Sequence, residues 1–365
     1  MKVKVYGAGS IGNHLTQASR RLGWDVSVVD KDTEALRRMK EEIYPMRYGA
    51  WDFEIKQYTP ENEPKGGFDV IFLGVPPHVR IALAKEVLAE NPKVLQLEKP
   101  ICGPNFEGVE EFLEELKKHP DVKVVNGYEY VLSKFVNGAE EILKSGFLGN
   151  HQSMDVEIRE RWDGIFGAHP WLSGPQDTYL GFWKKGGGAS GEHSHGMNLF
   201  QHLACLLNLG KVTEVCANLK YIKDDKVDYD ESCFINLTTE KGYIGRVVQD
   251  VITFPVKMNA RIQGDGGYLE CIKGYSKDGD LIKYQKNDEE EKEYFFSKNR
   301  PDDFYAEILH INDILEGKVD IKDSPISLER GLETMLIIAA AHKSAQEKRT
   351  VKIDYSKGFN LEALS

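Results

Sequence analysis

The stretch "VKVYGAGSIGNHL", residues 3–15, decides the fold. It starts as an apolar strand and continues as a helix, and three glycines with the spacing GxGxxG join the two. The first glycine permits a tight turn, the second lets the backbone approach a pyrophosphate, and the third allows the helix to pack closely on the strand. This pattern predicts a dinucleotide site at the N-terminus of the helix. The residues expected to form it are Gly7, Gly9, Ser10, Ile11 and Gly12.

An aspartate supports the same interpretation. The second apolar run, "DVSVVD", ends at Asp30, 18 residues after Gly12. A carboxylate at this place accepts hydrogen bonds from the adenosine ribose hydroxyls and repels a 2′-phosphate. Lys31 follows directly and leaves some room for that phosphate. We therefore expect NAD as the cofactor, with NADP as the less favoured alternative.

The N-terminal third of the chain alternates strand-like and helix-like runs. Apolar runs such as "DVIFLGV" and "VKVVNGY" are separated by amphipathic runs such as "TEALRRMKEEI", which predicts a parallel sheet with right-handed crossovers. Beyond residue 150, longer alternating segments such as "HQSMDVEIRERW" predict an antiparallel sheet. The expected fold class is α/β, with an N-terminal Rossmann doubly wound sheet and a C-terminal α/β domain that contains a large, mostly antiparallel open sheet.

The length of the chain favours two domains. A sequence of 365 residues with 41% hydrophobic content is long enough to bury two cores. Residues 1–125 are expected to form the NAD-binding Rossmann domain, and residues 126–365 the substrate-binding and oligomerisation domain. Beyond the first domain, we expect helices near residues 197–207, 302–316 and 327–346.

Composition excludes several classes of partner. The formal charge is −11 and lysine and arginine are spread along the chain, so we expect no nucleic-acid partner. No apolar run approaches the roughly 20 residues that cross a bilayer, and the chain starts directly with a strand, so we expect no membrane association and no signal peptide. Five scattered cysteines indicate buried thiols in a reducing compartment. The expected location is the cytoplasm.

Two further strand ends carry chemistry. In "LGVPPHV", Gly74, Pro76 and His78 follow a buried run, at the edge where a doubly wound sheet binds its ligand, although the same residues would also suit a plain turn. In "VLQLEKPICG", Glu98 and Lys99 end another buried run. A lysine there is a suitable proton donor or acceptor for a carbinol. The alternative is a surface ion pair between the two side chains.

These motifs together resemble the glucose-fructose oxidoreductase, inositol dehydrogenase and MocA (Gfo/Idh/MocA) oxidoreductase family. "GAGSIG", "VPPH", "EKP", "NGYEY", "GFLGN" and a GGG followed by a histidine helix occur in the family's order, over nearly the whole chain. The resemblance implies a tightly held NAD(P) and a homodimer or homotetramer formed through the C-terminal sheet. It also implies that Lys99 is the catalytic or substrate-orienting lysine and places Tyr128 of "NGYEY" at the substrate.

The stretch "GGGASGEHSH", residues 186–195, departs from the family pattern. The family has an aspartate four residues before its histidine; if His195 is that histidine, the aspartate position is a glycine and Glu192 stands one place late. A helix from His195 would place Asn198 and His202 on the same stripe. We expect the bend to bring Glu192, His193 and His195 opposite Lys99, with Asn198 near the substrate and His202 mainly structural.

Metal binding is the rival interpretation of this stretch. Two histidines two residues apart with a nearby carboxylate are able to ligate zinc. However, the resemblance implies hydride transfer without a metal, and no cysteine is adjacent in sequence. We therefore expect no metal.

Aromatic residues between 159 and 183 suit a carbohydrate. The segment holds three of the five tryptophans, and Arg161, Trp162 and Trp183 are the substrate contacts we expect there, because aromatic faces and guanidinium groups bind sugar rings and their hydroxyls. The alternative is that the aromatic side chains form core or oligomer contacts.

The sequence as a whole predicts an NAD-dependent oxidoreductase. It would transfer hydride between a secondary hydroxyl of a sugar, sugar derivative or cyclitol and the nicotinamide ring, with Lys99, His195 and Glu192 as the catalytic residues. Two alternatives remain open. One is a glycosidase or epimerase that uses NAD without net redox change, and the other is a non-catalytic NAD-binding protein.

Overall fold

The computed structural model describes residues 1–298 and 302–365 and divides into two compact units. The first contains residues 1–101, 107–129 and 302–328, and the second contains 102–106, 130–298 and 329–365. The predicted domain boundary is a single cut at residue 125, whereas these units are discontinuous in sequence, because residues 302–328 return to the first unit. The functional division into an NAD-binding and a substrate-binding domain stays a prediction.

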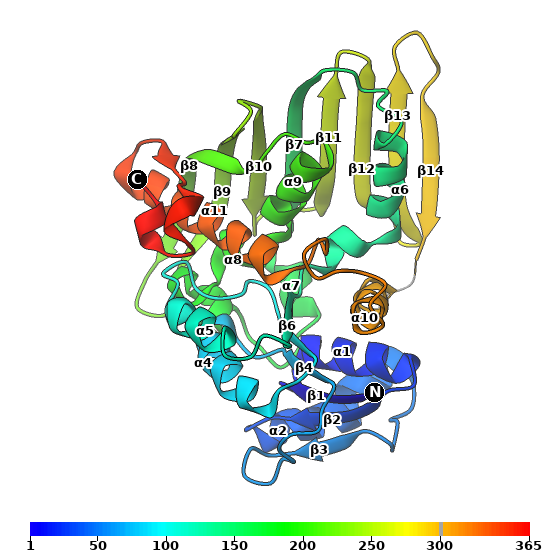
Figure 1. The fold of residues 1–365 in the computed structure, drawn as a ribbon, viewed down its shortest axis with the longest axis vertical. Helices are drawn as coiled ribbons and strands as arrows, with labels where there is room; N and C mark the ends of the chain where they lie inside the picture. Colours follow the sequence, from blue (N-terminus) through cyan, green and yellow to red (C-terminus); the bar gives the residue numbers. More distant parts are fainter. Residues whose placement is uncertain (299–301) are drawn as a thin grey trace. The chain divides into compact units, whose positions relative to one another are not determined.

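The first unit is built on a parallel sheet of six strands (Figure 1). Its order, β3-β2-β1-β4-β5-β6, is that of a doubly wound Rossmann sheet, in which the order reverses between β1 and β4. Ligands bind such sheets beyond the carboxyl ends of the strands, at this reversal. The strands are β1 (Lys2–Tyr6), β2 (Asp25–Val29), β3 (Lys56–Tyr58), β4 (Val70–Leu73), β5 (Val94–Leu97) and β6 (Lys123–Asn126).

Helices connect these strands. They are α1 (Ser10–Arg21), α2 (Thr33–Arg38), α3 (Tyr44–Tyr48), α4 (Pro77–Val87), α5 (Val109–Leu116) and α10 (Asp302–Leu315). The helix expected over 33–43 runs on through a π-helical turn, η1 (Met39–Ile43), into α3. In that turn, Tyr44 N–H donates to the Met39 carbonyl, and Pro45, which has no N–H, follows it.

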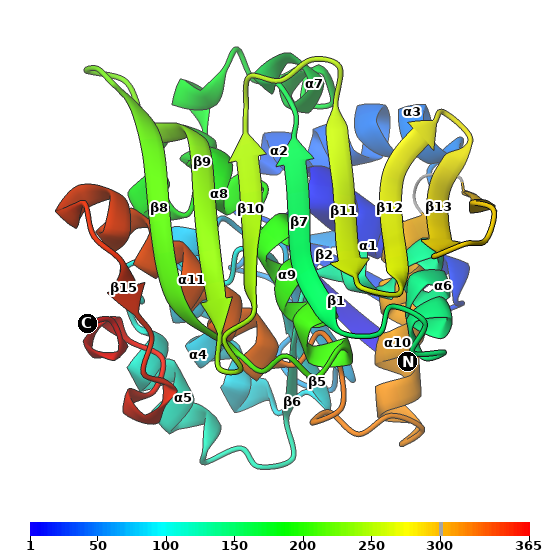
Figure 2. The ribbon, with the colours of Figure 1, turned by 90° about the horizontal axis from the view of Figure 1, so that it is seen from above.

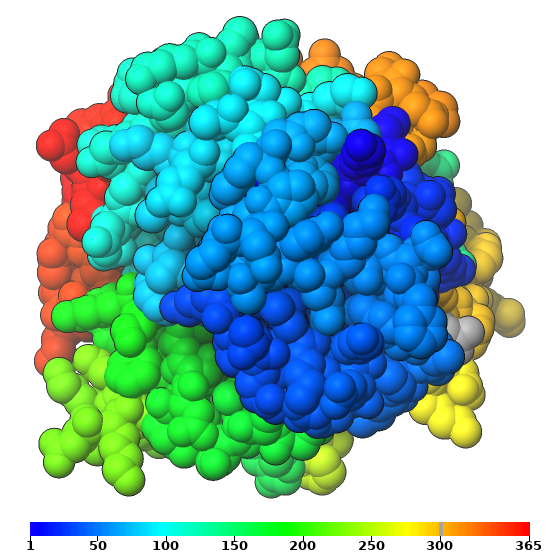
Figure 3. All heavy atoms as spheres, turned by 90° about the horizontal axis from the view of Figure 1, so that it is seen from below, coloured from blue at the N-terminus to red at the C-terminus, as the bar shows by residue number. Residues whose placement is uncertain are grey.

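Helix α10 belongs to the first unit although it comes late in the sequence. It packs against α1: the Arg21 guanidinium lies 2.9 Å from an Asp302 carboxylate oxygen, and the rings of His14 and Phe304 stack 4.4 Å apart. Figure 3 shows the orange atoms of this segment beside the dark blue N-terminal residues.

The second unit is built on a sheet of nine strands (Figure 2). All neighbouring strands are antiparallel except β7 and β10, which are parallel. The predicted fold class is thereby confirmed. In sheet order the strands are β14 (Lys292–Ser297), β13 (Gly279–Lys286), β12 (Gly267–Ser276), β11 (Lys257–Gly264), β7 (His151–Arg159), β10 (Ile244–Asp250), β9 (Asp228–Thr239), β8 (Val212–Lys223) and β15 (Val351–Lys352).

Helices α6 (Lys134–Leu143), α9 (His195–Leu206) and α11 (Leu328–Glu347) lie on one face of this sheet (Figure 2). Side chains alternate accordingly: along β9, Phe234 and Asn236 are exposed, whereas Ile235 and Leu237, which follow them in turn, are buried. Helices α7 (Trp162–Gly167) and α8 (Gly188–Glu192) connect β7 to α9. Among the described residues, no helix has both the length and the apolar character needed to span a bilayer.

Candidate functional site

In the glycine turn after β1, one glycine has free space where a Cβ would lie, and the other two are needed for the geometry of the turn. Gly7 has a φ of +106°, a conformation that favours glycine, and a Cβ at Gly12 would collide with the Gly7 carbonyl oxygen. A Cβ at Gly9 would meet no atom within 4 Å. Gly7 and Gly12 are therefore required by the fold of the turn itself, whereas Gly9 leaves its outer side accessible.

Asp30, at the end of β2, is fixed against this turn. One carboxylate oxygen accepts a hydrogen bond from the Ala8 N–H at 2.8 Å, and the other accepts one from the Asp32 N–H at 2.9 Å. The side chain is half-buried. Its carboxylate thus lies beside the glycine turn, as the sequence predicts.

The ends of β4 and β5 are tied together by Arg80, a residue that sequence reasoning missed. Its buried guanidinium donates to the carbonyls of Leu73 at 3.2 Å, Val75 at 2.5 Å and Glu98 at 2.6 Å. The available signal was a lone arginine on the buried side of α4. Its hydrogen bonds fix the strand ends that carry Gly74 and Pro76, before α4, and Glu98, after β5; His78 lies exposed in the first turn of α4.

Glu98 is buried at the edge of the sheet. Its carboxylate accepts hydrogen bonds from Gln96 Nε2 at 2.8 Å and from the Lys99 N–H at 3.2 Å. A Cβ at Gly127 would approach this carboxyl group to 2.6 Å, so the glycine of "NGYEY" makes room for it. Burial raises the pKa of Glu98, and the positive charge of Arg80 opposes the rise. The cofactor role predicted for Glu98 stays a prediction.

A second buried carboxyl group lies behind Glu98. Glu307 of α10 accepts a hydrogen bond from Gln96 Nε2 at 2.9 Å, so that one amide bridges two acids. Burial raises the pKa of Glu307 well above its usual range, and the charges of Glu98 and Glu129 raise it further. Burial thus favours the neutral form of Glu307 over its charged form. Glu307 lies in an amphipathic helix of ordinary composition, and nothing in the local sequence predicted that its carboxyl group would be buried.

The residues predicted in the first unit all follow the carboxyl ends of its parallel strands. Lys99 is half-buried directly after β5, and Tyr128 is fully buried after β6, where its N–H donates to the Asn126 side chain at 3.1 Å. Because the strands are parallel, these ends share one edge of the sheet. That edge carries Gly7, Gly9, Asp30, Gly74, Pro76, Glu98, Lys99 and Tyr128.

The glycine bend of the second unit has no room for a Cβ at Gly187 or Gly188. Gly186 and Gly188 have φ values of +88° and +75°. A Cβ at Gly188 would collide with an Asp230 carboxylate oxygen, and one at Gly187 would collide with the Tyr179 carbonyl. These glycines let the short helix α8 pack directly against β9.

A buried hydrogen-bond chain anchors α8. Ser190 donates to Asp230 from its N–H at 2.7 Å and from its hydroxyl at 3.0 Å. The hydroxyl has one proton, so it accepts from His342 Nε2, which lies 3.0 Å away, and His342 Nδ1 then accepts from the Tyr221 hydroxyl at 2.7 Å. The donors therefore run in one direction, from Tyr221 to Asp230.

Burial sets the charge states in this chain. It lowers the pKa of His342 to about 3 and raises the pKa of Asp230 to about 7. The order of donors requires a neutral His342 ring, because Nδ1 must accept a hydrogen bond while Nε2 donates one. Trp183, predicted as a substrate contact, stacks on the His342 ring with 4.3 Å between centroids.

The two histidines of "EHSH" lie in different surroundings. His193, between α8 and α9, is buried, and its Nε2 lies 3.4 Å from the Glu160 carbonyl oxygen. His195 begins α9, is half-buried and meets the Tyr130 ring edge-on at 6.0 Å. Glu192 ends α8 and is also half-buried.

The rest of the predicted stripe on α9 faces α11. Asn198 is buried and its side-chain NH₂ donates to the Thr334 hydroxyl at 3.1 Å. Burial, helped by the charge of Arg330, lowers the pKa of His202 to about 4. The mainly structural role expected for His202 and the substrate contact expected for Asn198 both stay predictions.

The predicted aromatic contacts have packing partners within the second unit. Trp162 lies 5.3 Å from Phe166 and 5.6 Å from Tyr229, at the border of a buried cluster that includes Ile165 and Leu180. Arg161 is exposed and pairs with Asp163 at 2.6 Å. These contacts support the alternative that Trp162 is a core residue. Arg161, in contrast, is accessible to solvent.

Comparison with known families decides the classification. The family model described as the C-terminal alpha/beta domain of the Gfo/Idh/MocA oxidoreductases matches residues 170–353, about half of the chain. The chain belongs to the Gfo/Idh/MocA oxidoreductase family. The resemblance found in the sequence is thereby confirmed. No curated protein matches the sequence.

Solved structures share the Gfo/Idh/MocA fold at low identity. An oxidoreductase from Agrobacterium radiobacter, solved with NAD⁺, L-tartaric acid and magnesium, is 18% identical, with 96% of this chain and 98% of that chain covered and a TM-score of 0.74. The WlbA dehydrogenase from Bordetella pertussis, solved with NADH and UDP-GlcNAcA, is 18% identical over 97% and 98%, with a TM-score of 0.71. An aldose-aldose oxidoreductase from Caulobacter crescentus, complexed with glycerol, is 16% identical over 97% and 99%, with a TM-score of 0.73.

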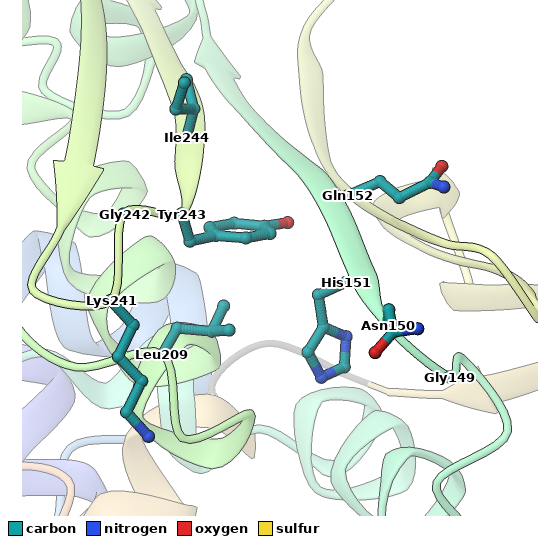
Figure 4. A pocket seen from close by; sticks show the side chains of 9 residues that line it. All are labelled: Gly149, Asn150, His151, Gln152, Leu209, Lys241, Gly242, Tyr243 and Ile244. Carbon is teal, nitrogen blue, oxygen red and sulfur yellow. The ribbon is translucent and has the colours of Figure 1, made fainter.

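The described residues contain no cluster of metal-ligating side chains, and they form a pocket on the nine-stranded sheet. Within residues 1–298 and 302–365, no group of three or more His, Cys, Asp or Glu side chains is arranged to hold a metal ion. A pocket of about 430 Å³ lies at one end of the nine-stranded sheet, where the rings of His151 and Tyr243 face it (Figure 4). None of the predicted site residues lines this pocket; its residues are Gly149, Asn150, His151, Gln152, Leu209, Lys241, Gly242, Tyr243 and Ile244.

Proposed function

We propose that this Gfo/Idh/MocA protein is an NAD-dependent oxidoreductase that acts on a secondary hydroxyl of a sugar, sugar derivative or cyclitol. The observation that carries the proposal is the pairing of Asp30 with the Ala8 N–H at the glycine turn, at the strand-order reversal of a Rossmann sheet. This arrangement fits a dinucleotide, because the turn is open at Gly9 and a carboxylate for the ribose hydroxyls is fixed beside it.

The cofactor would be held at the carboxyl edge of the first sheet. Gly7, Gly9 and Gly12 admit its pyrophosphate, and Asp30 accepts hydrogen bonds from its adenosine ribose. A 2′-phosphate would meet the Asp30 carboxylate, so NAD is favoured over NADP. When bound, the nicotinamide ring supplies the hydride acceptor or donor.

The chain's own residues would handle the proton. Lys99 lies at the same edge, and its amine is the group we assign to take the carbinol proton on oxidation and return it on reduction. His195 and Glu192, both half-buried, would orient the hydroxyl and complete the proton path. His193 is a weaker candidate, because its ring is buried against the Glu160 carbonyl.

Relatives of the same fold support the substrate class. Those described above were solved with tartaric acid, a UDP-linked sugar acid or glycerol, all of them polyhydroxylated. Arg161 is accessible for a charged or hydroxyl group of such a substrate, and Trp162, Trp183, Tyr128 and Asn198 remain further candidates for its contacts. No nucleic-acid or membrane partner is part of this proposal.

Assembly and location complete the proposal. The face of the nine-stranded sheet that carries no helix among the described residues would join copies into a homodimer or homotetramer. All five cysteines lie in the described residues and are free thiols, which suits the cytoplasm. The expectation that all of them are buried was wrong for Cys205 and Cys216, which are exposed.

The central test is Lys99→Met. This change keeps the side-chain stem and removes the amine, so turnover with a sugar or cyclitol substrate should fall on the order of 100-fold or more while NAD binding is retained. Lys93→Met is the matched control, since Lys93 lies just before the opposite end of β5, is 65% exposed and pairs with Asp69. Turnover in Lys99→Met equal to that of Lys93→Met would contradict the assignment. Turnover without net NADH formation would instead support the redox-neutral alternative.

A second test separates the histidines. His195→Ala should lower turnover strongly, whereas His193→Ala should act mainly on stability, because its ring packs inside the second unit. Glu192→Gln should give an intermediate loss with the cofactor still bound. If His193→Ala were inactive and stably folded while His195→Ala remained near wild type, the roles of the two histidines would be exchanged.

A further inference from the structure

Arg47, which the sequence did not single out, reaches the glycine turn from α3. Its Nη1 donates to the Ser10 hydroxyl at 2.9 Å and to the Ser10 carbonyl at 3.3 Å, and lies 3.4 Å from His14 Nε2. Ser10 is the first residue of α1 and lies inside GxGxxG. The guanidinium therefore lies at the same helix start that is expected to receive the pyrophosphate.

The position of Arg47 is built into the first unit. The neighbouring Tyr48 hydroxyl lies 2.6 Å from His14 Nδ1, and the buried His14 ring stacks on Phe304 of α10, 4.4 Å apart and 6° from parallel. The π-helical turn before Pro45 shifts the register of α3 by one residue relative to a regular helix. Arg47 and Tyr48 thus contact two residues on one side of α1, Ser10 and His14.

A cation at this place is electrostatically unusual. The N-terminus of a helix carries a partial positive charge and favours anions, and α1 has no acidic residue in its first turn. Arg47 adds a full positive charge beside that turn. The Asp30 carboxylate lies beside the same turn. A diphosphate brought there would still be attracted by the helix start and by the planar guanidinium, which is suited to phosphate oxygens.

We propose that Arg47 is a cofactor-binding residue that contacts the pyrophosphate of the dinucleotide, oriented by its hydrogen bond to Ser10. The inference rests on the proposed function, since it concerns the same cofactor. Arg37 of α2, in the same helical segment, differs from Arg47 because its guanidinium forms exposed ion pairs with carboxylates. These carboxylates belong to Glu34, Glu41 and Glu42.

Binding measurements on the purified full-length protein test the proposal without any substrate. Titration calorimetry with NAD, ADP-ribose, AMP and adenosine separates the diphosphate from the nucleoside. Arg47→Gln should weaken NAD and ADP-ribose by roughly 10- to 100-fold and adenosine by less than about twofold, as expected for a charged hydrogen bond to phosphate. Arg37→Gln, with the same change of charge, should bind all four ligands like the wild type.

Ionic strength gives an independent readout. In the wild type, raising the salt concentration should weaken ADP-ribose binding more than adenosine binding, and Arg47→Gln should reduce this difference. Arg47→Lys keeps the charge, so it should retain ADP-ribose binding within several-fold, and it serves as the test variant should the glutamine protein not fold.

Several outcomes would overturn the assignment. NAD and ADP-ribose affinity within twofold of wild type in Arg47→Gln would remove Arg47 from the cofactor site. Equal weakening of adenosine and ADP-ribose would assign it to packing of α3. A wild-type protein that binds neither NAD nor ADP-ribose would refute the proposed function itself, which is a distinguishable failure.

Discussion

Each of the two units contains a glycine stretch, a helix after it and an aspartate that accepts a backbone N–H. In the first unit Asp30 accepts from Ala8, is half-buried, and lies beside a glycine whose Cβ would meet nothing within 4 Å. In the second, Asp230 accepts from Ser190, is fully buried, and collides with a Cβ placed on Gly188. The same residue types thus form an open turn that leaves room for a ligand and a closed one that packs the chain against itself.

The role of each glycine in such a motif therefore depends on which atoms surround the position that a Cβ would occupy. No described atom lies within 4 Å of a Cβ placed on Gly9, whereas Asp230 of β9 excludes a Cβ at Gly188.

The largest effect is expected for alanine at the closed bend. Gly188→Ala combines a positive φ with a collision against Asp230, so it should cost more than about 3 kcal/mol of unfolding free energy or prevent folding. Gly9→Ala, with a φ of −75°, should cost less than about 1 kcal/mol but weaken NAD binding at least tenfold. Urea unfolding and cofactor titration measure both. Equal destabilisation by Gly188→Ala and Gly9→Ala would contradict the claim that a Cβ is excluded at Gly188 and accommodated at Gly9.

Removing the two aspartates should separate stability from binding. Asp230→Ala leaves the buried N–H and hydroxyl of Ser190 without their acceptor and should cost about 2–4 kcal/mol. Asp30→Ala should cost about 1 kcal/mol, because the Asp32 N–H that it leaves is exposed to water and only the Ala8 N–H belongs to a buried residue. It should also narrow the preference for NAD over NADP by about tenfold. Unfolding curves and the two cofactor affinities are the measurements. Equal wild-type affinity for NAD and NADP would contradict the role of Asp30.

The most gradual effect is a dependence of stability on pH. The pKa of Asp230 is about 7 in the folded chain against 3.8 in the unfolded reference, so its stabilising contribution is complete below pH 4 and is lost as pH rises through 7. The lowered pKa values of His342 and His202 act in the opposite direction. The difference between wild type and Asp230→Asn isolates the carboxyl group, and should change by about 1 kcal/mol per pH unit between pH 4 and 7. A difference that is flat over this range would mean that Asp230 ionises normally.

The sequence predicted what local periodicity encodes. The apolar runs at β1, β2, β4, β5 and β6 and the helices α1, α2, α4 and α5 were found, because a buried parallel strand and an amphipathic helix have distinct patterns. The short helix α3 was not found. Strand β3, three residues long, and helix α6 were missed. The return of α10 to the first unit was also missed, since nothing in an amphipathic helix states which sheet it covers.

The candidate sites divide in the same way. Glycine spacing and strand ends located Asp30 and Lys99 without a structure. Arg80, the Gln96–Glu307 pair and the Ser190–Asp230 pair depend on contacts between residues distant in sequence. Such contacts have no periodicity, so a single sequence does not reveal them.

The parallel pairing of β7 with β10 has a consequence for synthesis of the chain. The two strands that flank β7 follow it by about 90 to 100 positions, so at a translation rate of about 5 to 20 residues per second β7 is made roughly 5 to 20 s before either partner. During that interval both of its edges present unsatisfied backbone groups, the usual template for aggregation. We therefore expect nascent chains that end before β10 to bind chaperones, and chains extended beyond β11 to be released from them.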